Sequence, residues 1–433
     1  MSGSLNITAA TVDPGLLDLP WNLPLEVWPD ENIAALPKGI SRHLVRFVHL
    51  SGYVVAIKET SAELARKEYD MLRTLQRLDI PCVEPVAVIT QREADDGEEL
   101  ASALVTRHLR FSLPYRALYS QALRPDTATR LVDALAVLLA RLHVIGFFWG
   151  DVSLSNTLFR RDAGAFAAYL VDAETGKLYD GGLSNGQREN DLEIARINIA
   201  GELLDLQAGG RLDEDIDPVA IADGIVTAYR NLWTELTVAE SFPTSERWRI
   251  NQRVERLNDL GFDIEELSIA QVESGTQVRI QPKVVDAGHH SRRLLRLTGL
   301  DAGENQARRL LNDLDAYRAT GDRKDLDEEM VAHDWLARVF EPVIRSIPKE
   351  LRNKLEPAEV FHQLLDHRWY LSQQQNRNVP LAEALSSYID TVLRQRRDEM
   401  TMVGPTTDAF TAPLHVIDAA ADDGDDDDWM AKV

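Results

Sequence analysis

A polar loop between two apolar segments is the feature that most restricts how this chain can fold. Residues 150–159 read GDVSLSNTLF, and Asp151 and Asn156 lie five residues apart within them. Both side chains can therefore emerge at the same strand end. A second apolar run, Tyr169–Val171, is predicted as a strand and leads directly to Asp172. The sequence thus brings two carboxylates and one carboxamide close together.

These residue types are the ones that phosphoryl transfer from a nucleotide requires. One carboxylate orients the attacking hydroxyl group, and an Asn and an Asp hold the magnesium ion that bridges the phosphates. Asp and Asn after an apolar helix are, however, also common turn formers and helix caps. Spacing alone favours that structural interpretation, so the chemical interpretation depends on an independent signal upstream.

A predicted β-hairpin upstream carries the first part of that signal. Residues 44–50 and 53–57 are rich in β-branched and aromatic side chains and are separated by a Ser-Gly pair, which favours a tight turn. Alternation along the second strand places Ala56 and Lys58 on the same face. The small Ala56 leaves room for a flat ring, although a lysine at a strand end is usually just solvated.

The segment Ala62–Leu78 is predicted as a helix, and its pattern gives Lys58 a partner. Its apolar stripe consists of Leu64, Met71, Leu75 and Leu78. Glu68 falls on the same stripe. A carboxylate that faces a core costs on the order of several kcal/mol unless it is paired, so we expect an ion pair between Glu68 and Lys58. Glu63 and Asp70 fall on the outer face, where we expect ordinary surface charges.

The pattern that follows predicts a small sheet and then helices. Strands are expected at Val83–Ile89 and Leu100–Thr106, with the acidic residues 93–99 as an exposed hairpin tip. The next part of the chain is predicted to be mainly helical, and a long helix ending near Val144 leads to the polar loop.

A further predicted helix, Asn190–Leu206, contains Asp191 in its first turn. Asn190 is a good N-cap, and Asp191 and Glu193 suit the positive end of a helix. Alternatively, Asp191 anchors the polar loop from beneath. Both interpretations stay open at the level of sequence.

Together these residues resemble the protein-kinase-like superfamily over about residues 36–235. The motif Val55-Ala56-Ile57-Lys58 is similar to the kinase strand that carries the nucleotide-binding lysine, and the polar loop has the D-x-x-x-x-N spacing of kinase catalytic loops. The resemblance implies an α+β, two-lobed kinase-like fold that uses ATP and Mg²⁺. The implied catalytic residues are Asp151, Lys58 and Glu68, the nucleotide-binding residues are Lys58, Ala56, Gly39 and Ser41, and the metal ligands are Asn156 and Asp172.

The details are similar to compact atypical kinases. Ser153 stands two residues after Asp151, as in RIO-type kinases, and the segment Glu68–Pro85 is similar to lipopolysaccharide-kinase and RIO-like sequences. Residues 361–372, FHQLLDHRWYLS, resemble a bacterial family of unknown function that is often described as lipopolysaccharide-kinase related.

Three departures from typical protein kinases limit what the resemblance implies. No G-x-G-x-x-G precedes the Lys58 strand, and only Gly39, in the run 38–43, could form a loop over phosphates. Ala173 and Glu174 follow Asp172, where protein kinases have Phe and Gly. No A-P-E motif follows. These departures put a protein substrate in doubt more than they put nucleotide binding in doubt.

The region after Phe242 carries no catalytic motif and is predicted to be mostly helical, with one strand at Thr276–Val285. Two closely joined helices are expected at Ser291–Leu297 and Glu304–Tyr317. Their arginines either pair with nearby Asp residues or bind an anionic partner. The arginines are Arg292, Arg293, Arg296, Arg308 and Arg309, and the nearby acids are Asp301, Asp313 and Asp315. The predicted aromatic core comprises Trp335, Phe340, Phe361, Trp369 and Tyr370.

Composition limits the classes of partner and environment. A chain of 433 residues with 44% hydrophobic residues can bury a sizeable core. A formal net charge of −23 argues against nucleic acid or anionic membrane as a general partner. Cys82 is the only cysteine, so no intrachain disulfide can form. With no leader-like opening and no run suited to crossing a bilayer, we expect a cytoplasmic protein without a transmembrane segment.

These signals predict five parts and two alternative functions. The parts are an extended N-terminal arm (1–35), a kinase-like N-lobe (36–110), a kinase-like C-lobe (111–240), a mostly helical C-terminal domain (241–400) and a disordered acidic tail (401–433). The first function is ATP-dependent transfer of the γ-phosphate to an unknown hydroxyl acceptor. The alternative is a nucleotide-binding scaffold whose C-terminal domain binds a protein partner.

Overall fold

The computed structural model describes residues 5–399, except residues 12, 30–32, 35–43, 121–122, 273–276, 320–322 and 324. Gly39, Ser41 and the acidic tail therefore lie outside the described residues. The chain divides into two compact units. Up to residue 400, the first comprises Met1–Arg160 and Ala168–Leu232, and the second comprises Arg161–Ala167 and Trp233–Met400.

The first unit begins with a five-stranded antiparallel sheet in the order β1-β4-β7-β3-β2. The predicted hairpin is confirmed, and the N-terminal arm supplies edge strand β1 as well as two short 3-10 helices, Pro14–Asp18 and Leu25–Val27. The expected acidic hairpin tip is also present. The strands are β1 Asn6–Ala9, β2 Val45–Leu50, β3 Tyr53–Thr60, β4 Glu84–Thr90, β5 Arg92–Glu93, β6 Glu99–Leu100 and β7 Ser102–Arg107.

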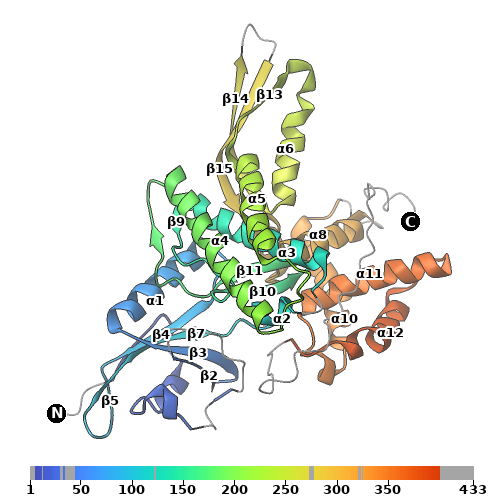
Figure 1. Ribbon diagram of the computed structural model, residues 1–433. Coiled ribbons are helices and arrows are strands. Elements are labelled where there is room, and N and C mark those ends of the chain that lie inside the picture. Colours follow the sequence, from blue (N-terminus) through green and yellow to red (C-terminus); the bar gives the residue numbers. More distant parts are fainter. Residues whose placement is uncertain are drawn as a thin grey trace. The chain divides into compact units, whose positions relative to one another are not determined.

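Helix α1, Ala62–Arg77, packs against β4 and β7 (Figure 1). The side chain of Ser61 caps its first turn by accepting a hydrogen bond from the Leu64 amide at 3.3 Å. The buried face consists of Ala65, Glu68, Tyr69, Leu72 and Leu75. Glu68 is buried as predicted, but the rest of the predicted stripe is partly wrong. Leu78 is 40% exposed because it is the C-cap, where the backbone leaves the helix, and Leu64 and Met71 are only half-buried.

The rest of the first unit is mainly helical with short strands. Its helices are α2 Tyr115–Leu118, α3 Pro125–Val144, α4 Asn185–Ala208 and α5 Pro218–Thr237, the last of which continues into the second unit. Its strands are β8 Leu113–Pro114, β9 Phe147–Phe148, β10 Thr157–Asp162, β11 Ala165–Leu170 and β12 Lys177–Leu178, and the tip of the β10–β11 hairpin belongs to the second unit. They form the sheets β11-β10-β8 and β12-β9.

The start of α4 corrects one prediction. Asn190 is not an N-cap, because the helix begins at Asn185, one turn earlier. There Ser184 and Gln187 form a reciprocal capping box, in which each side chain bonds the other residue's backbone amide. Asp191 consequently lies inside the helix, where it is fully buried.

The second unit combines a three-stranded antiparallel sheet, in the order β13-β15-β14, with helices. Only β15 was expected from the sequence. The strands are β13 Glu240–Pro243, β14 Phe262–Val272 and β15 Gln277–Ala287, and α6, Trp248–Asp259, runs alongside them (Figure 1). The later helices are α7 His289–Thr298, α8 Glu304–Ala319, α9 Glu328–Trp335, α10 Glu341–Ser346, α11 Pro357–Gln375 and α12 Leu381–Thr391. A π-helical turn, Leu336–Phe340, joins α9 to α10, and 3-10 turns cover Thr244–Glu246, Lys349–Leu351 and Leu393–Gln395.

An aromatic cluster holds the helices of the second unit together. Trp335, Phe340 and Phe361 are buried, with ring centroids 5.2–5.8 Å apart. Trp369 and Tyr370, predicted to belong to this core, are instead 50% and 54% exposed. They lie on the outer face of α11, whereas Leu371 of the same turn packs against the core, so the prediction was wrong for these two residues.

Two of the five arginines of α7 and α8, Arg293 and Arg309, lie close to acidic side chains, as one of the two interpretations proposed for the group. Arg293 lies 2.6 Å from Glu328 and 3.7 Å from Asp315. Arg309 lies 3.1 Å from Asp366.

The strands and helices of the two units make the fold class α+β, with a mostly helical C-terminal extension. Among the described residues, no helix is long and apolar enough to cross a membrane.

Candidate active site

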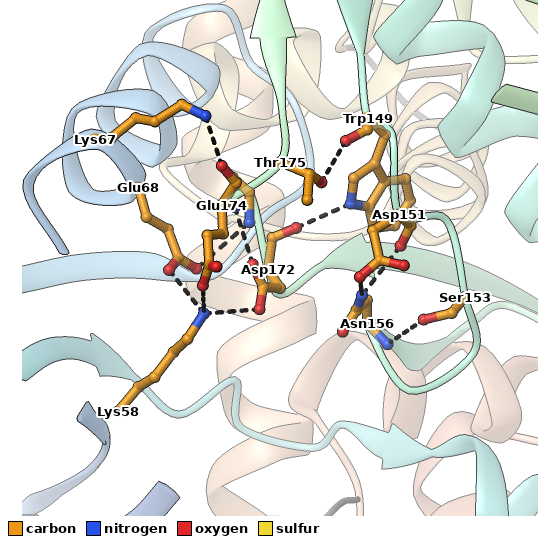
Figure 2. Close-up of polar contacts among 11 residues, drawn as sticks. Lys58, Lys67, Glu68, Trp149, Asp151, Ser153, Asn156, Asp172, Glu174 and Thr175 are labelled. Carbon is orange, nitrogen blue, oxygen red and sulfur yellow. Dashed lines mark hydrogen bonds and ion pairs between the residues drawn. The ribbon is translucent and has the colours of Figure 1, made fainter. Parts of the chain in front are cut away.

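Lys58 lies at the centre of a cluster of three carboxylates in the first unit (Figure 2). Its Nζ is 3.0 Å from Glu68 Oε2, 2.8 Å from Asp172 Oδ2 and 2.8 Å from Glu174 Oε2. Strand β3 supplies Lys58, helix α1 supplies Glu68, and the turn after β11 supplies the other two. The predicted ion pair between Lys58 and Glu68 is confirmed. Glu63 and Asp70 are exposed, also as predicted.

The alternation of β3 explains why Lys58 points into this cluster. Val55 and Ile57 are fully buried in the apolar core that includes Trp21 of the N-terminal arm. Lys58 and the half-buried Ala56 therefore face the opposite side of the sheet. Because Lys58 is only 9% exposed and Glu68 1%, neither charge could stay there without an opposite charge beside it.

The surroundings raise the pKa of both members of the ion pair. Burial acts to lower the pKa of the Lys58 ammonium, but the negative charges of Glu68 and Asp172 outweigh it, so the pKa lies above its usual value. Burial raises the pKa of the Glu68 carboxyl to about 7, and the charge of Asp172 acts in the same direction. Lys58 is therefore cationic at neutral pH, whereas Glu68 exchanges its proton near neutrality.

The turn from Asp172 to Thr175 is held by several hydrogen bonds. Asp172 Oδ1 accepts one from the Glu174 amide at 2.9 Å, and the carbonyl oxygen of Asp172 accepts one from Trp149 Nε1 at 2.9 Å. Thr175 Oγ1 donates to the carbonyl oxygen of Trp149 at 2.7 Å, and Lys67 Nζ donates to that of Glu174 at 2.7 Å (Figure 2). This segment is therefore tied both to helix α1 and to the residues just before the polar loop.

Asp151 and Asn156 lie together, as their spacing predicts. Asn156 Nδ2 donates to the carbonyl oxygen of Asp151 at 3.0 Å and to its Oδ2 at 3.2 Å. Asn198 Nδ2, from α4, contacts the other carboxylate oxygen of Asp151 at 3.3 Å and the carbonyl oxygen of Val152 at 3.1 Å. The Asp151 carboxylate is thus oriented on both sides by carboxamides.

Asp191 anchors the polar loop from beneath, so the second of its two interpretations is confirmed. Its carboxylate accepts hydrogen bonds from the backbone amides of Trp149 and Gly150, both at 2.7 Å. His143 Nε2 lies 3.2 Å from the same carboxylate, and His143 Nδ1 lies 2.7 Å from the Tyr229 hydroxyl. This fully buried network fixes the backbone immediately before Asp151.

Glu202 holds the rest of the loop. Its two carboxylate oxygens accept hydrogen bonds from the amides of Leu154 and Ser155, at 2.7 and 3.0 Å. Ser153 Oγ accepts one from the Asn156 amide at 3.1 Å. The backbone therefore presents Asp151 and Asn156 in one defined arrangement.

Comparisons with known proteins agree with this geometry. Residues 49–195 match the lipopolysaccharide kinase (Kdo/WaaP) family. Residues 231–393 match a domain of unknown function, DUF4032. The resemblance to lipopolysaccharide kinases and to a family of unknown function is therefore confirmed.

A structure described as WaaP in complex with acyl carrier protein is 16% identical, with a TM-score of 0.35, and the match covers 59% of this chain and 99% of that chain. No curated protein matches the sequence. The family match itself spans Lys58, Glu68, Asp151, Asn156 and Asp172.

Sequence reasoning missed three residues that contact the polar loop or Lys58. Asn198 and Glu202 follow Asp191 by seven and eleven residues in α4. This spacing places all three on one helix face, and that periodicity could have identified them. Glu174 was noted only as a departure from the kinase pattern, yet it contacts Lys58.

The oxygen atoms around Lys58 suit a hard divalent cation. Ligand atoms of Glu68, Asp172 and Glu174 all lie within 4.8 Å of one another. Carboxylate and carboxamide oxygens are the groups that Mg²⁺ prefers. The Asp172 and Glu174 side chains are 30% and 22% exposed, whereas the Glu68 side chain is 2% exposed. Asp172 and Glu174 are therefore the carboxylates of this group that a cation can reach from solvent.

Proposed function

We propose that this protein is an ATP-dependent phosphotransferase that moves the γ-phosphate to a hydroxyl acceptor. The observation that carries the proposal is the buried Lys58, which is paired with Glu68 on one side and with Asp172 on the other. The Asp151–Asn156 pair lies in the same unit. Phosphoryl transfer uses this set of groups: a buried lysine among carboxylates, and a further carboxylate, here Asp151, that acts on the acceptor.

Lys58 and Ala56 form the donor side of the proposed site. The Lys58 ammonium binds oxygen atoms of the ATP phosphates, and Glu68 holds it in position. Ala56, on the same face of β3, leaves space for the adenine ring. Gly39 and Ser41 are proposed to cover the phosphates.

Asn156 and Asp172 are the proposed ligands of Mg²⁺, with Glu174 as a further candidate. When bound, this ion offsets the negative charge of the phosphates. The backbone joins Asn156 to the residue just before Asp172, because the Val171 amide donates a hydrogen bond to the carbonyl oxygen of Asn156 at 3.0 Å.

Asp151 acts on the acceptor. Its carboxylate orients the acceptor hydroxyl and receives the proton as the hydroxyl oxygen bonds to the γ-phosphorus. The bond between the γ-phosphorus and the β–γ bridging oxygen breaks, and ADP leaves. Asn156 and Asn198 keep the carboxylate in the orientation that this step needs.

One observation favours the alternative of a nucleotide-binding scaffold. Glu174 stands where protein kinases have Gly and lies 2.8 Å from Lys58, so it competes with phosphate for the ammonium. In that alternative the protein binds ATP without transferring phosphate, and the second unit binds a protein partner.

The substitution Asp151→Asn separates the two functions. We expect it to keep ATP affinity, because Asp151 acts on the acceptor, and to lower the transfer rate about a hundredfold or more. The measurement is transfer of labelled γ-phosphate in lysate from cells lacking the protein. Protein, lipid, sugar and small-molecule fractions are analysed separately, which also identifies the acceptor class.

The transferase and the scaffold predict different outcomes of this experiment. A labelled product that appears with the wild type and not with Asp151→Asn supports the transferase. If both proteins bind ATP and neither gives a product in any fraction, the scaffold is correct and the transferase is not.

A further inference from the structure

The hairpin β10–β11 connects the two proposed metal ligands. Strand β10 begins at Thr157, immediately after Asn156, and β11 ends at Leu170, two residues before Asp172. The hydrogen bond between the Val171 amide and the Asn156 carbonyl closes its base. Any force that shifts one strand along the other therefore changes how Asn156 and Asp172 face each other.

The tip of this hairpin, Arg161–Ala167, belongs to the second unit. There Asp162, only 2% exposed, caps helix α8. Its Oδ1 accepts a hydrogen bond from the Gln306 amide at 2.7 Å, and its Oδ2 accepts two from Asn305, from the amide and from Nδ2, both at 3.1 Å.

The sequence just before α8 offers no capping side chain, so another segment supplies the cap. The residue before the helix is Gly303, which has no side chain with which to cap it. A Cβ atom at that position would come within 2.4 Å of Asp162 Oδ1. The glycine thus leaves the space that the Asp162 carboxylate occupies.

A buried polar network holds the residues on either side of Asp162. Arg161 forms a bidentate ion pair with Glu399, in which its Nε lies 3.0 Å from Oε2 and its Nη2 lies 2.9 Å from Oε1. The Ala163 amide donates to Glu359 Oε2 at 3.0 Å. Gln306 Nε2 donates to the Arg161 carbonyl oxygen at 2.9 Å and to Glu359 at 3.2 Å.

This network is closed, because its carboxylates are all 2–3% exposed and each accepts several hydrogen bonds. A buried network that is fully satisfied permits a single geometry and resists displacement. A hairpin tip held in this way cannot slide or twist freely. The hairpin is only six residues long on each strand, so a restraint at the tip is transmitted along one short ladder to the base.

We propose that Asp162 is a positioning residue for the metal site. The domain of unknown function thereby contributes to kinase function, because its residues hold this hairpin in place. The inference rests on the proposed function. By linkage, the effect is reciprocal: binding of Mg²⁺ and ATP at the base must stabilise the contacts at the tip.

The test is the Mg²⁺ dependence of ATP binding by the full-length chain carrying Asp162→Asn. An amide group in place of the carboxylate turns an N–H toward the donors of α8 and releases part of the cap. We expect the Mg²⁺ concentration at half-maximal ATP binding to rise about tenfold. This is the usual size of the effect when a residue that orients a metal ligand, without binding the metal itself, is replaced. ATP affinity without Mg²⁺ should stay unchanged.

Asp313→Asn is the matched control. Asp313 is a half-buried carboxylate of α8 and accepts a hydrogen bond from Trp335 Nε1 at 2.8 Å, but among the described residues it forms no hydrogen bond or ion pair with the hairpin. It should lower thermal stability and leave the Mg²⁺ dependence as in the wild type. An equal shift in both variants would overturn the proposal, because it would reflect general destabilisation of the second unit.

Hydrogen exchange in the wild type provides a measurement that does not depend on folding of the variant. Mg²⁺ with ATP should slow exchange at the amides of Asn305 and Gln306. Unchanged exchange there, or an unchanged Mg²⁺ dependence in Asp162→Asn, overturns this inference alone. If the wild type binds no ATP at all, the proposed function fails and this inference fails with it.

Discussion

The Lys58 cluster of the first unit and the Asp162 cluster of the second both bury charged side chains, and they differ in how far they are closed. Around Asp162 and Glu359, backbone amides and carboxamides occupy the carboxylates, which are almost inaccessible to solvent. Around Lys58, one ammonium faces three carboxylates, and Asp172 and Glu174 keep exposed edges. A closed cluster can only support structure, whereas an open one with excess negative charge can accept a cation and exchange a ligand.

Glu68→Ala gives the largest expected effect on this contrast. Without Glu68, Lys58 loses a charged hydrogen bond that is worth about 1.5–3 kcal/mol, so affinity for Mg²⁺-ATP should fall about tenfold or more. Titration calorimetry measures it. Glu63→Ala, an exposed glutamate of the same helix, is the control and should change little; equal losses in both would contradict the assigned role of Glu68.

Glu174→Gln tests the role of the third carboxylate in the Lys58 cluster. If Glu174 helps to hold the metal, the Mg²⁺-dependent part of ATP binding should weaken, by a smaller factor than in Glu68→Ala. The carboxamide keeps one oxygen ligand and removes only the charge. Stronger ATP binding in the variant would show instead that Glu174 blocks Lys58, as the scaffold alternative requires.

The pH dependence of stability tests the Glu68 carboxyl by a separate measurement. Glu68 has a pKa of about 7 in the folded protein, against an ordinary value of 4.5. Between these values the folded protein keeps a proton that the unfolded chain has lost, so this residue's contribution to stability falls as pH rises from about 4.5 to about 7. Glu68→Gln should remove this component from the unfolding temperature measured across that range, and an unchanged profile would contradict the raised pKa.

Local pattern was sufficient to predict the core of the candidate site. Strand alternation placed Lys58, and helical periodicity placed Glu68 on a buried face, because both depend on neighbours within one element. The same reasoning could not choose between the two interpretations of Asp191. The choice depends on the loop amides that its carboxylate reaches, 41 and 42 residues earlier in the chain.

Contacts between distant segments explain the rest of what was missed. The burial of Asp162 depends on α8, more than 140 residues later, and nothing near Asp162 in the sequence indicates it. Trp369 and Tyr370 are aromatic residues in a helix whose other face is buried, so their exposure depends on where the core lies. The boundaries of the five predicted parts remain a prediction.

Thermal unfolding with and without Mg²⁺-ATP tests the central claim most directly, because both proposed functions require the Lys58 cluster to bind nucleotide. At millimolar ATP the wild type should unfold at a higher temperature than without it, since a ligand that binds only the folded state stabilises that state. Lys58→Met should abolish the shift, and Lys177→Met, at an exposed lysine of β12, should keep it. Identical unfolding of the wild type with and without nucleotide would contradict the account.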